Sequence, residues 1–239
     1  MENKPKIGIM GLGTFGKCLY RWLSEEYHVE AFTRSLRGAT CQTMEELVSK
    51  VDIIFLCVPI GKFEEILKQI IPLLRPGQMI VDVCSVKVKP VEWMVKNLPD
   101  NIKILATHPM FGPQSAAESL EGLNFMYSRI RCEENDIVWL LDFLNKYKLN
   151  IAEMTPEEHD RIAARTQALS FFVGHLLKRG GLPKTSIDTT QYRMLANFSD
   201  QICEDTEELF EDLLKYNPYA KDVISEFVEN ANQLFNERF

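Results

Sequence analysis

The chain lacks any apolar run approaching the roughly 18 residues that cross a bilayer, and its N-terminus lacks the apolar segment of a signal peptide. We therefore expect a cytoplasmic protein with no membrane partner. Its six cysteines are scattered, without a CxxC pair. This spacing excludes the usual zinc sites and disulfide frameworks, so we expect reduced thiols and no metal.

An excess of positive charge is also missing. Residues 1–150 carry 18 Lys and Arg against 18 Asp and Glu, whereas residues 151–239 carry 9 against 16, which accounts for the whole net charge of −7. Binding to phosphate backbones needs clustered Lys and Arg. The sequence therefore disfavours a nucleic-acid partner. The hydrophobic content of 46% is that of an ordinary globular protein.

A glycine motif lies close to the N-terminus. Residues 6–10 are short and apolar, as in a buried parallel strand, and GLGTFG at residues 11–16 follows directly, before a helical pattern. In this context Gly11 permits a tight turn, Gly13 lets a pyrophosphate approach the backbone, and Gly16 lets helix and strand pack closely. The helix N-terminus supplies amide groups for the phosphates. The sequence therefore predicts a dinucleotide site.

The second predicted strand, residues 29–32, ends without an acid. An NAD site usually offers an Asp or Glu there to the ribose 2′-hydroxyl, whereas this chain offers Thr33, Arg34 and Ser35. An arginine can bind a phosphate through two hydrogen bonds, so we predict NADP rather than NAD, the alternative being that Arg34 is merely solvated. The next strand ends at Pro59. The expected cofactor contacts are Gly11, Gly13, Thr14, Phe15, Gly16, Thr33, Arg34, Ser35, Val58 and Pro59.

Two further polar side chains are expected at the same edge of the sheet. A strand at residues 79–83 precedes Ser85 and Lys87. Another apolar strand precedes THPMFGP at residues 107–113, a rigid loop that contains His108. Ligands of doubly wound sheets lie beyond the carboxyl ends of the strands, so we expect Ser85 and His108 near the nicotinamide. Either could be an ordinary capping or turn residue, and that is what we expect of Lys87.

The alternation of strands and helices ends near residue 154. Residues 1–154 thus predict an α/β unit with a Rossmann-type, doubly wound and mostly parallel sheet. Residues 155–239 read as helices only, beginning with one long helix from about 156 to 178 that is buried over most of its surface. Further helices are expected at residues 190–203, 205–216 and 219–235. Helices without a sheet cannot readily bury their own apolar faces, so we expect an all-helical dimerisation domain and a homodimer.

Four polar residues of the helical half are candidates for substrate contact: His159, Arg165, Gln167 and Arg193. Arg193 lies in an otherwise apolar stretch. An arginine there either pairs with an internal acid or binds an anionic ligand, and from the residues alone we favour the internal pair.

Six short segments follow one another along the chain: GLGTFG at 11–16, DVCSVK at 82–87, THPMFGP at 107–113, PEEHD at 156–160, QAL at 167–169 and Tyr192-Arg193. In this combination the chain resembles the prephenate/arogenate dehydrogenases of tyrosine biosynthesis. The similarity runs over nearly the whole chain. The HPMFGP segment is quite specific, whereas the glycine motif is shared with every Rossmann enzyme.

The resemblance implies an NAD(P)-dependent oxidative decarboxylation of a cyclohexadienol. A hydride leaves the ring carbon that bears the 4-hydroxyl, CO2 is lost, and the ring becomes aromatic. It implies that His108 accepts the hydroxyl proton and that Ser85 orients that hydroxyl. It also implies that Arg193 binds a substrate carboxylate and that Gln167 contacts the substrate. Members that prefer arogenate over prephenate can carry an acid after the HPMFGP loop, and Glu118 is the counterpart here.

Two alternatives remain open. The chain could be another Rossmann-plus-helical dehydrogenase, of the β-hydroxyacid dehydrogenase or imine reductase type. Those enzymes often place a key lysine on the long first helix, which here has no lysine before Lys178. It could also be a non-catalytic NADP-binding regulator. The presence of Ser85, His108 and Arg193 argues against that, because a sensor need not keep all three.

Overall fold

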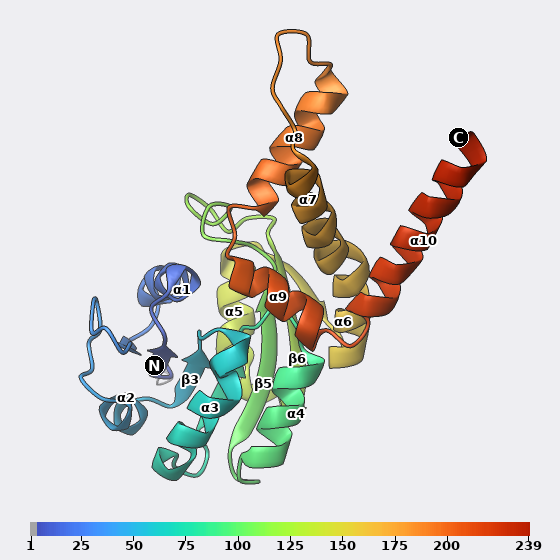
Figure 1. Cartoon of the computed structure of the whole chain (residues 1–239). Helices are drawn as coiled ribbons and strands as arrows, with labels where there is room; N and C mark the ends of the chain where they lie inside the picture. Colours follow the sequence, from blue (N-terminus) through green and yellow to red (C-terminus); the bar gives the residue numbers. More distant parts are fainter. Residues whose placement is uncertain (1–3) are drawn as a thin grey trace. The chain divides into compact units, whose positions relative to one another are not determined.

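The computed structural model describes residues 4–239, and the chain divides into two compact units, Met1–Pro156 and Glu157–Phe239. The first unit contains all seven strands that are assigned within the described residues, and the second is helical (Figure 1). No helix within residues 4–239 is long and apolar enough to cross a membrane.

The strands of the first unit form one sheet in the order β2-β1-β3-β4-β5-β6-β7. Neighbouring strands run parallel except β5 and β6. The chain moves from β1 to β2 on one side and then to β3 on the other, which is the switch point of a doubly wound sheet. This confirms the predicted sheet. The strands are β1 (Ile7–Met10), β2 (Val29–Phe32), β3 (Ile53–Leu56), β4 (Met79–Asp82), β5 (Lys103–Pro109), β6 (Asn124–Arg131) and β7 (Asn150–Glu153).

Helices cover both faces of this sheet. α3 and α4 pack side by side on one face (Figure 1), and Trp22 of α1 packs edge to face against Tyr147, the residue that directly follows α5. The central strands β1, β3 and β4 are buried along their full length, as expected of apolar strands enclosed on both faces. The helices are α1 (Thr14–Ser24), α2 (Met44–Lys50), α3 (Ile60–Ile70), α4 (Val88–Asn97) and α5 (Val138–Lys146), with 3₁₀ turns at Ile71–Leu73 and Glu134–Asp136.

The end of β5 differs from the prediction. The strand continues to Pro109, so Thr107, His108 and Pro109 belong to it and not to a loop. The reason is a long-range pairing, because β6 returns antiparallel beside β5 and pairs Pro109 with Phe125. The missing amide of the proline does not interrupt the ladder, since the next amide, of Met110, donates to the Asn124 carbonyl at 3.0 Å.

The helical unit begins with α6 (Pro156–Ala163). A π-helical turn (Ala164–Ala168) separates α6 from α7 (Leu169–Gly180), so the predicted long helix is present but interrupted. The hydroxyl groups of Thr166 and Ser170 each donate to the carbonyl four residues earlier, a contact that perturbs helices. The three later helices are confirmed: α8 (Thr190–Ile202), α9 (Glu207–Tyr216) and α10 (Ala220–Arg238).

Burial of the long helix is less complete than predicted. The side chains of Ile162 and Leu176 remain 49% and 50% exposed. The C-terminal half of α10 is exposed as well, including Leu234 at 57% and Phe235 at 62%. The helical unit therefore leaves apolar side chains uncovered along several helices.

Candidate functional site

The glycine turn after β1 is shaped by close packing. Gly11 has a φ of +105°, and a Cβ there would lie 2.2 Å from the carbonyl oxygen of Cys57. A Cβ on Gly16 would lie 2.0 Å from the carbonyl oxygen of Gly11. Gly13, by contrast, has no atom within 4 Å of its ideal Cβ position. Two glycines are thus required by the fold, and the middle one leaves space against which a phosphate can pack.

The start of α1 suits an anion. Its N-cap residue is Gly13, so no side chain caps the helix, and the first turn contains no acid. The amide groups at such an end carry partial positive charge and point outward. Thr14 is exposed at the first position of the helix, and Phe15 follows it. The turn therefore fits a dinucleotide pyrophosphate.

Residues at the end of β3 lie against the same turn. Val58 Cγ1 is 3.2 Å from the ideal Cβ position of Gly11. Pro59 is exposed and is the N-cap residue of α3. The structure thus brings Gly11, Gly16 and Val58 together, as the parallel pairing of β1 and β3 requires.

The loop after β2 carries the residues expected at the adenosine end. Thr33 is half-buried, whereas Arg34 and Ser35 are exposed. The far side of the loop approaches the glycine turn, because a Cβ on Gly38 would lie 3.8 Å from Leu12. No acid occurs between residues 33 and 41. The loop therefore offers cationic and hydroxyl groups with no carboxylate of its own.

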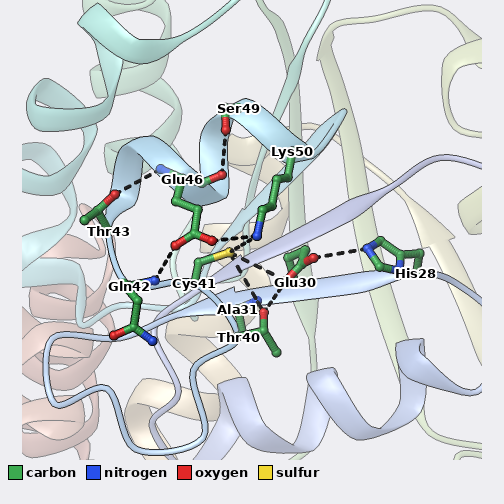
Figure 2. A network of polar contacts seen from close by, with 10 residues as sticks. All are labelled: His28, Glu30, Ala31, Thr40, Cys41, Gln42, Thr43, Glu46, Ser49 and Lys50. Carbon is green, nitrogen blue, oxygen red and sulfur yellow. Dashed lines mark hydrogen bonds and ion pairs between the residues drawn. The ribbon is translucent and has the colours of Figure 1, made fainter.

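Glu30, the acid on β2, is engaged elsewhere (Figure 2). Its carboxylate accepts hydrogen bonds from the Thr40 hydroxyl and, at 3.6 Å, from the Cys41 thiol, and it lies 3.2 Å from His28. These contacts, led by the Thr40 hydrogen bond, lower the pKa of Glu30. Thr40 also accepts from the Ala31 amide at 2.8 Å. Glu30 thus holds the end of this loop, at Thr40 and Cys41, against strand β2.

His108 and Ser85 lie at the carboxyl edge of the sheet. The register of β4 and β5 ends at the pair Asp82 and Ala106, and His108 follows two residues later, 4% exposed. Ser85 lies in the turn between β4 and α4 and is half-buried. Because β1, β3, β4 and β5 are parallel, this edge is also the one that carries the glycine turn.

Lys87 is not the ordinary capping residue that we expected. It occupies the N-cap position of α4, but its side chain makes no capping bond and is fully buried beside Asp82, with Nζ 2.5 Å from Oδ1. Burial raises the pKa of the Asp82 carboxyl, and the Lys87 ammonium opposes that rise. An aspartate within the apolar run of β4 was the signal that a buried partner had to exist.

Glu118 lies on the loop after β5 and is exposed. The loop is anchored to α1, because Arg21 donates to the Ala116 carbonyl at 2.7 Å and Trp22 donates to the same oxygen at 3.1 Å. The rings of Phe15 and Phe111 lie 6.4 Å apart. The helix that begins at the glycine turn therefore holds the segment that follows His108, a link that the sequence did not indicate.

In the helical unit, Gln167 lies within the π-helical turn. Its Oε1 atom is buried and has no hydrogen-bond partner within residues 4–239. His159 and Arg165 have internal partners, at 2.8 Å to Asp160 and 3.2 Å to Glu226. A π-helical turn is a frequent feature of functional sites, and Gln167 is the candidate that retains an unused acceptor.

Arg193 does not form the internal ion pair that we favoured. It is exposed on α8, and its guanidinium donates to the Thr190 hydroxyl at 3.4 Å. No acid within residues 4–239 forms a salt bridge with it. The physical reason is its position, since Met194 and Leu195 beside it are also exposed, at 67% and 40%.

The chain matches two family models. Residues 23–130 match "Prephenate dehydrogenase, nucleotide-binding domain", and residues 176–237 match "TYRAAT1-like, C-terminal domain". The first covers most of the sheet, and the second covers most of the helical unit.

Two curated plant proteins are similar over most of the chain. Arogenate dehydrogenase 1, chloroplastic, of Arabidopsis thaliana is 32% identical, with 94% of this chain and 38% of that protein covered. Arogenate dehydrogenase 2, chloroplastic, of the same species is also 32% identical, with 90% and 64% covered. The chain thus spans less than two thirds of the length of either relative.

A solved structure shares the fold. The prephenate dehydrogenase from A. aeolicus, crystallised with hydroxyphenyl propionate and NAD+, superposes with a TM-score of 0.76 at 16% identity, covering 98% of this chain and 90% of that one. Family model, relatives and fold agree with the motifs at the carboxyl edge of the sheet, and the chain is similar to the prephenate/arogenate dehydrogenases.

Proposed function

We propose that the chain catalyses the NADP-dependent oxidative decarboxylation of arogenate to tyrosine. One observation carries the proposal: a buried His108 lies at the same sheet edge as a glycine turn that fits a pyrophosphate. Two arogenate dehydrogenases are 32% identical to the chain, which supports arogenate over prephenate. Glu118 supports the same choice, because a carboxylate suits the ammonium group that arogenate has and prephenate lacks.

The cofactor would bind along the edge formed by the glycine turn and the loop after β2. The amide groups at the start of α1 would hold the pyrophosphate. Arg34 would bind the ribose 2′-phosphate, with Thr33 and Ser35 donating hydroxyl bonds. The engagement of Glu30 with Thr40 supports NADP over NAD, since that carboxylate is already occupied. When bound, NADP supplies the hydride acceptor.

His108 would act as the base. Its imidazole takes the proton of the 4-hydroxyl as the hydride departs from the same ring carbon, leaving a carbonyl there. The bond to the ring carboxylate then breaks, CO2 leaves, and its electron pair makes the ring aromatic. His108 returns the proton to the resulting phenolate. Ser85 would orient the hydroxyl toward the imidazole. A neutral imidazole is well populated near pH 7, which suits this role.

The remaining contacts would come from the helical unit and the loop after β5. Arg193 would bind a substrate carboxylate, a role supported by its lack of an ion pair within residues 4–239. Gln167 would contact the substrate, and its unused buried Oε1 supports this. Glu118 would face the amino group.

We further propose a homodimer formed through the helical unit. The support is the uncovered apolar surface of that unit, above all the exposed end of α10 with Leu234 and Phe235. Cytoplasmic location stays a prediction, since the two Arabidopsis relatives carry the description chloroplastic.

The test is the reduction of NADP by the purified protein with arogenate, with tyrosine and CO2 identified as products. Prephenate and NAD are assayed beside them in all combinations. Turnover fastest with arogenate and NADP is expected. Failure to turn over either cyclohexadienol would contradict the proposal, and tight NADP binding without turnover would identify a regulator instead.

A further inference from the structure

The carboxyl-terminal end of β5 has two unlike neighbours. On one side β6 pairs with it as far as Pro109. On the other side the ladder with β4 stops at the pair Asp82 and Ala106. Within residues 4–239, no strand flanks Thr107 and His108 on that edge, although both are buried. A buried backbone carbonyl at such a position needs a donor from another source.

Lys87 is that donor. Its Nζ atom lies 2.5 Å from the carbonyl oxygen of Thr107 and 2.5 Å from Oδ1 of Asp82. Thr107 is bound a second time, because its hydroxyl donates to the carbonyl oxygen of Asp82 at 2.7 Å. All three residues are fully buried. They form a buried polar unit, and in a low-dielectric interior each of its bonds is strong. Oδ2 of Asp82 is also buried and makes no hydrogen bond within residues 4–239.

The same unit holds the turn that contains Ser85. Oδ1 of Asp82 also accepts from the Cys84 amide at 2.8 Å, which fixes the start of the turn. Lys87 fixes its end, as the residue that precedes α4. Ser85 therefore lies between two fixed residues, Cys84 and Lys87. Lys87 binds the Thr107 carbonyl directly, and the Cys84 amide is linked to it through the shared Oδ1 of Asp82.

We propose that Lys87 is a positioning residue that holds His108 on β5 and Ser85 on the following turn in one fixed relation. Its catalytic consequence rests on the proposed function, whereas the contacts themselves do not. A base acts only within hydrogen-bond reach of its proton, about 2.6–3.2 Å between heavy atoms. A displacement of about 1 Å can lower the rate by roughly 100-fold. The carbonyl carbon of Thr107, whose oxygen Lys87 binds, is bonded directly to the backbone nitrogen of His108, the residue whose position matters most for catalysis.

A competing role is that Lys87 only neutralises Asp82. A variant that removes the charges of Asp82 and Lys87 together distinguishes the neutralising role from the positioning role. Asp82→Asn keeps the oxygen that accepts from Cys84, and Lys87→Met fills a similar volume without a donor. In the Asp82→Asn/Lys87→Met variant no buried charge is left unpaired, yet the Thr107 carbonyl has lost its donor.

The test compares Lys87→Met, the double variant and the control Lys89→Met, which removes an exposed lysine paired with Glu92 at 2.8 Å on the same helix. Thermal unfolding, NADP affinity, arogenate kinetics and the imidazole NMR signals are measured for each. The single variant is expected to be unstable. The double variant is expected to recover stability and NADP binding to within about threefold, with kcat lowered about 100-fold and KM little changed.

The NMR signals separate this inference from the proposed function. In the double variant the His108 ring signal should shift or broaden, while those of His28, His159 and His175 stay in place. A double variant with wild-type kcat and an unmoved His108 signal overturns the inference. If the wild type turns over no cyclohexadienol, the proposed function fails, and the His108 signal alone then tests the inference. A His108 signal that moves in the double variant supports a positioning role for Lys87, and an unmoved signal overturns that role.

Discussion

Glu30 and Thr40 face one another across the base of the loop that joins β2 to α2, and the Thr40 hydroxyl donates a hydrogen bond to Oε2 of Glu30 (Figure 2). The next residue, Cys41, donates its thiol to the same oxygen at 3.6 Å. A carboxylate that belongs to β2 thus closes the loop that carries Arg34. Closure of this kind fixes the loop before any ligand arrives.

The Glu30→Gln variant should lose acid-dependent stability. The pKa of Glu30 lies below its ordinary value of 4.5 because of the Thr40 hydrogen bond. A carboxyl whose folded pKa is lowered stabilises the fold above its unfolded pKa, and this contribution disappears as pH falls through the folded pKa. The variant should therefore be about 1 kcal/mol less stable near neutral pH, with the difference shrinking below pH 4.5.

Urea unfolding across this pH range measures the effect. Glu45→Gln is the matched control, since it removes an exposed acid from α2. An unfolding free energy of Glu30→Gln that tracks the wild type in parallel at every pH would show that the Glu30 contacts contribute no linkage.

The Arg34→Ala variant should discriminate against NADP alone. A charge-assisted contact to the 2′-phosphate contributes about 1.5–3 kcal/mol, so the Kd for NADP should rise roughly 10- to 100-fold while the Kd for NAD stays within about twofold. Titration calorimetry measures both. Lys50→Ala removes a nearby cation whose Nζ pairs with Glu46 at 2.6 Å and should change neither. An equal loss for both cofactors would exclude Arg34 from the phosphate site.

The Arg193→Ala variant should chiefly raise KM. A charge-assisted hydrogen bond to a carboxylate contributes about 1.5–3 kcal/mol, which predicts a rise in KM of roughly 10- to 100-fold with a small change in kcat. Steady-state kinetics with arogenate measures it. Arg179→Ala, an exposed arginine at the end of α7, is the control. An unchanged KM in Arg193→Ala would remove this residue from the substrate site.

The Leu234→Glu/Phe235→Glu variant should dissociate the proposed dimer. Both side chains are exposed in the chain alone, and burying a leucine or phenylalanine contributes about 1.5–3 kcal/mol each. Sedimentation velocity at micromolar concentration should show a dimer for the wild type and for Glu229→Gln on the same helix, and a monomer for the double variant. A wild type that is monomeric under these conditions would contradict the dimer.

Local patterns predicted most of the fold. Short stretches of sequence predict the glycine turn, the apolar strands and the helix starts. The order of these elements along the chain predicts the doubly wound sheet. The end of β5 could not be read in the same way. Pro109 and Gly112 are typical of a loop, and the pairing that extends the strand through His108 depends on β6, which lies well downstream. Helix α2 was missed because its seven residues are too few to show a periodic apolar face.

Contacts between side chains were the harder part. Lys87 follows a strand by a few residues, a position typical of a surface cap, and only the fold shows that it is buried against Asp82 and Thr107. The π-helical turn around Gln167 leaves no trace in the apolar periodicity. The exposure of Arg193 depends on the whole helical unit, so its apolar neighbours in sequence were misleading.

The most direct measurement is kcat for arogenate with NADP in the wild type and in His108→Asn. Loss of a general base lowers kcat by roughly 10²- to 10⁴-fold, and the Kd for NADP should remain unchanged because the proposed pyrophosphate contacts come from the glycine turn after β1 and not from His108 on β5. That outcome would establish His108 as the proton acceptor. A His108→Asn enzyme that retains kcat within tenfold of an active wild type would contradict it.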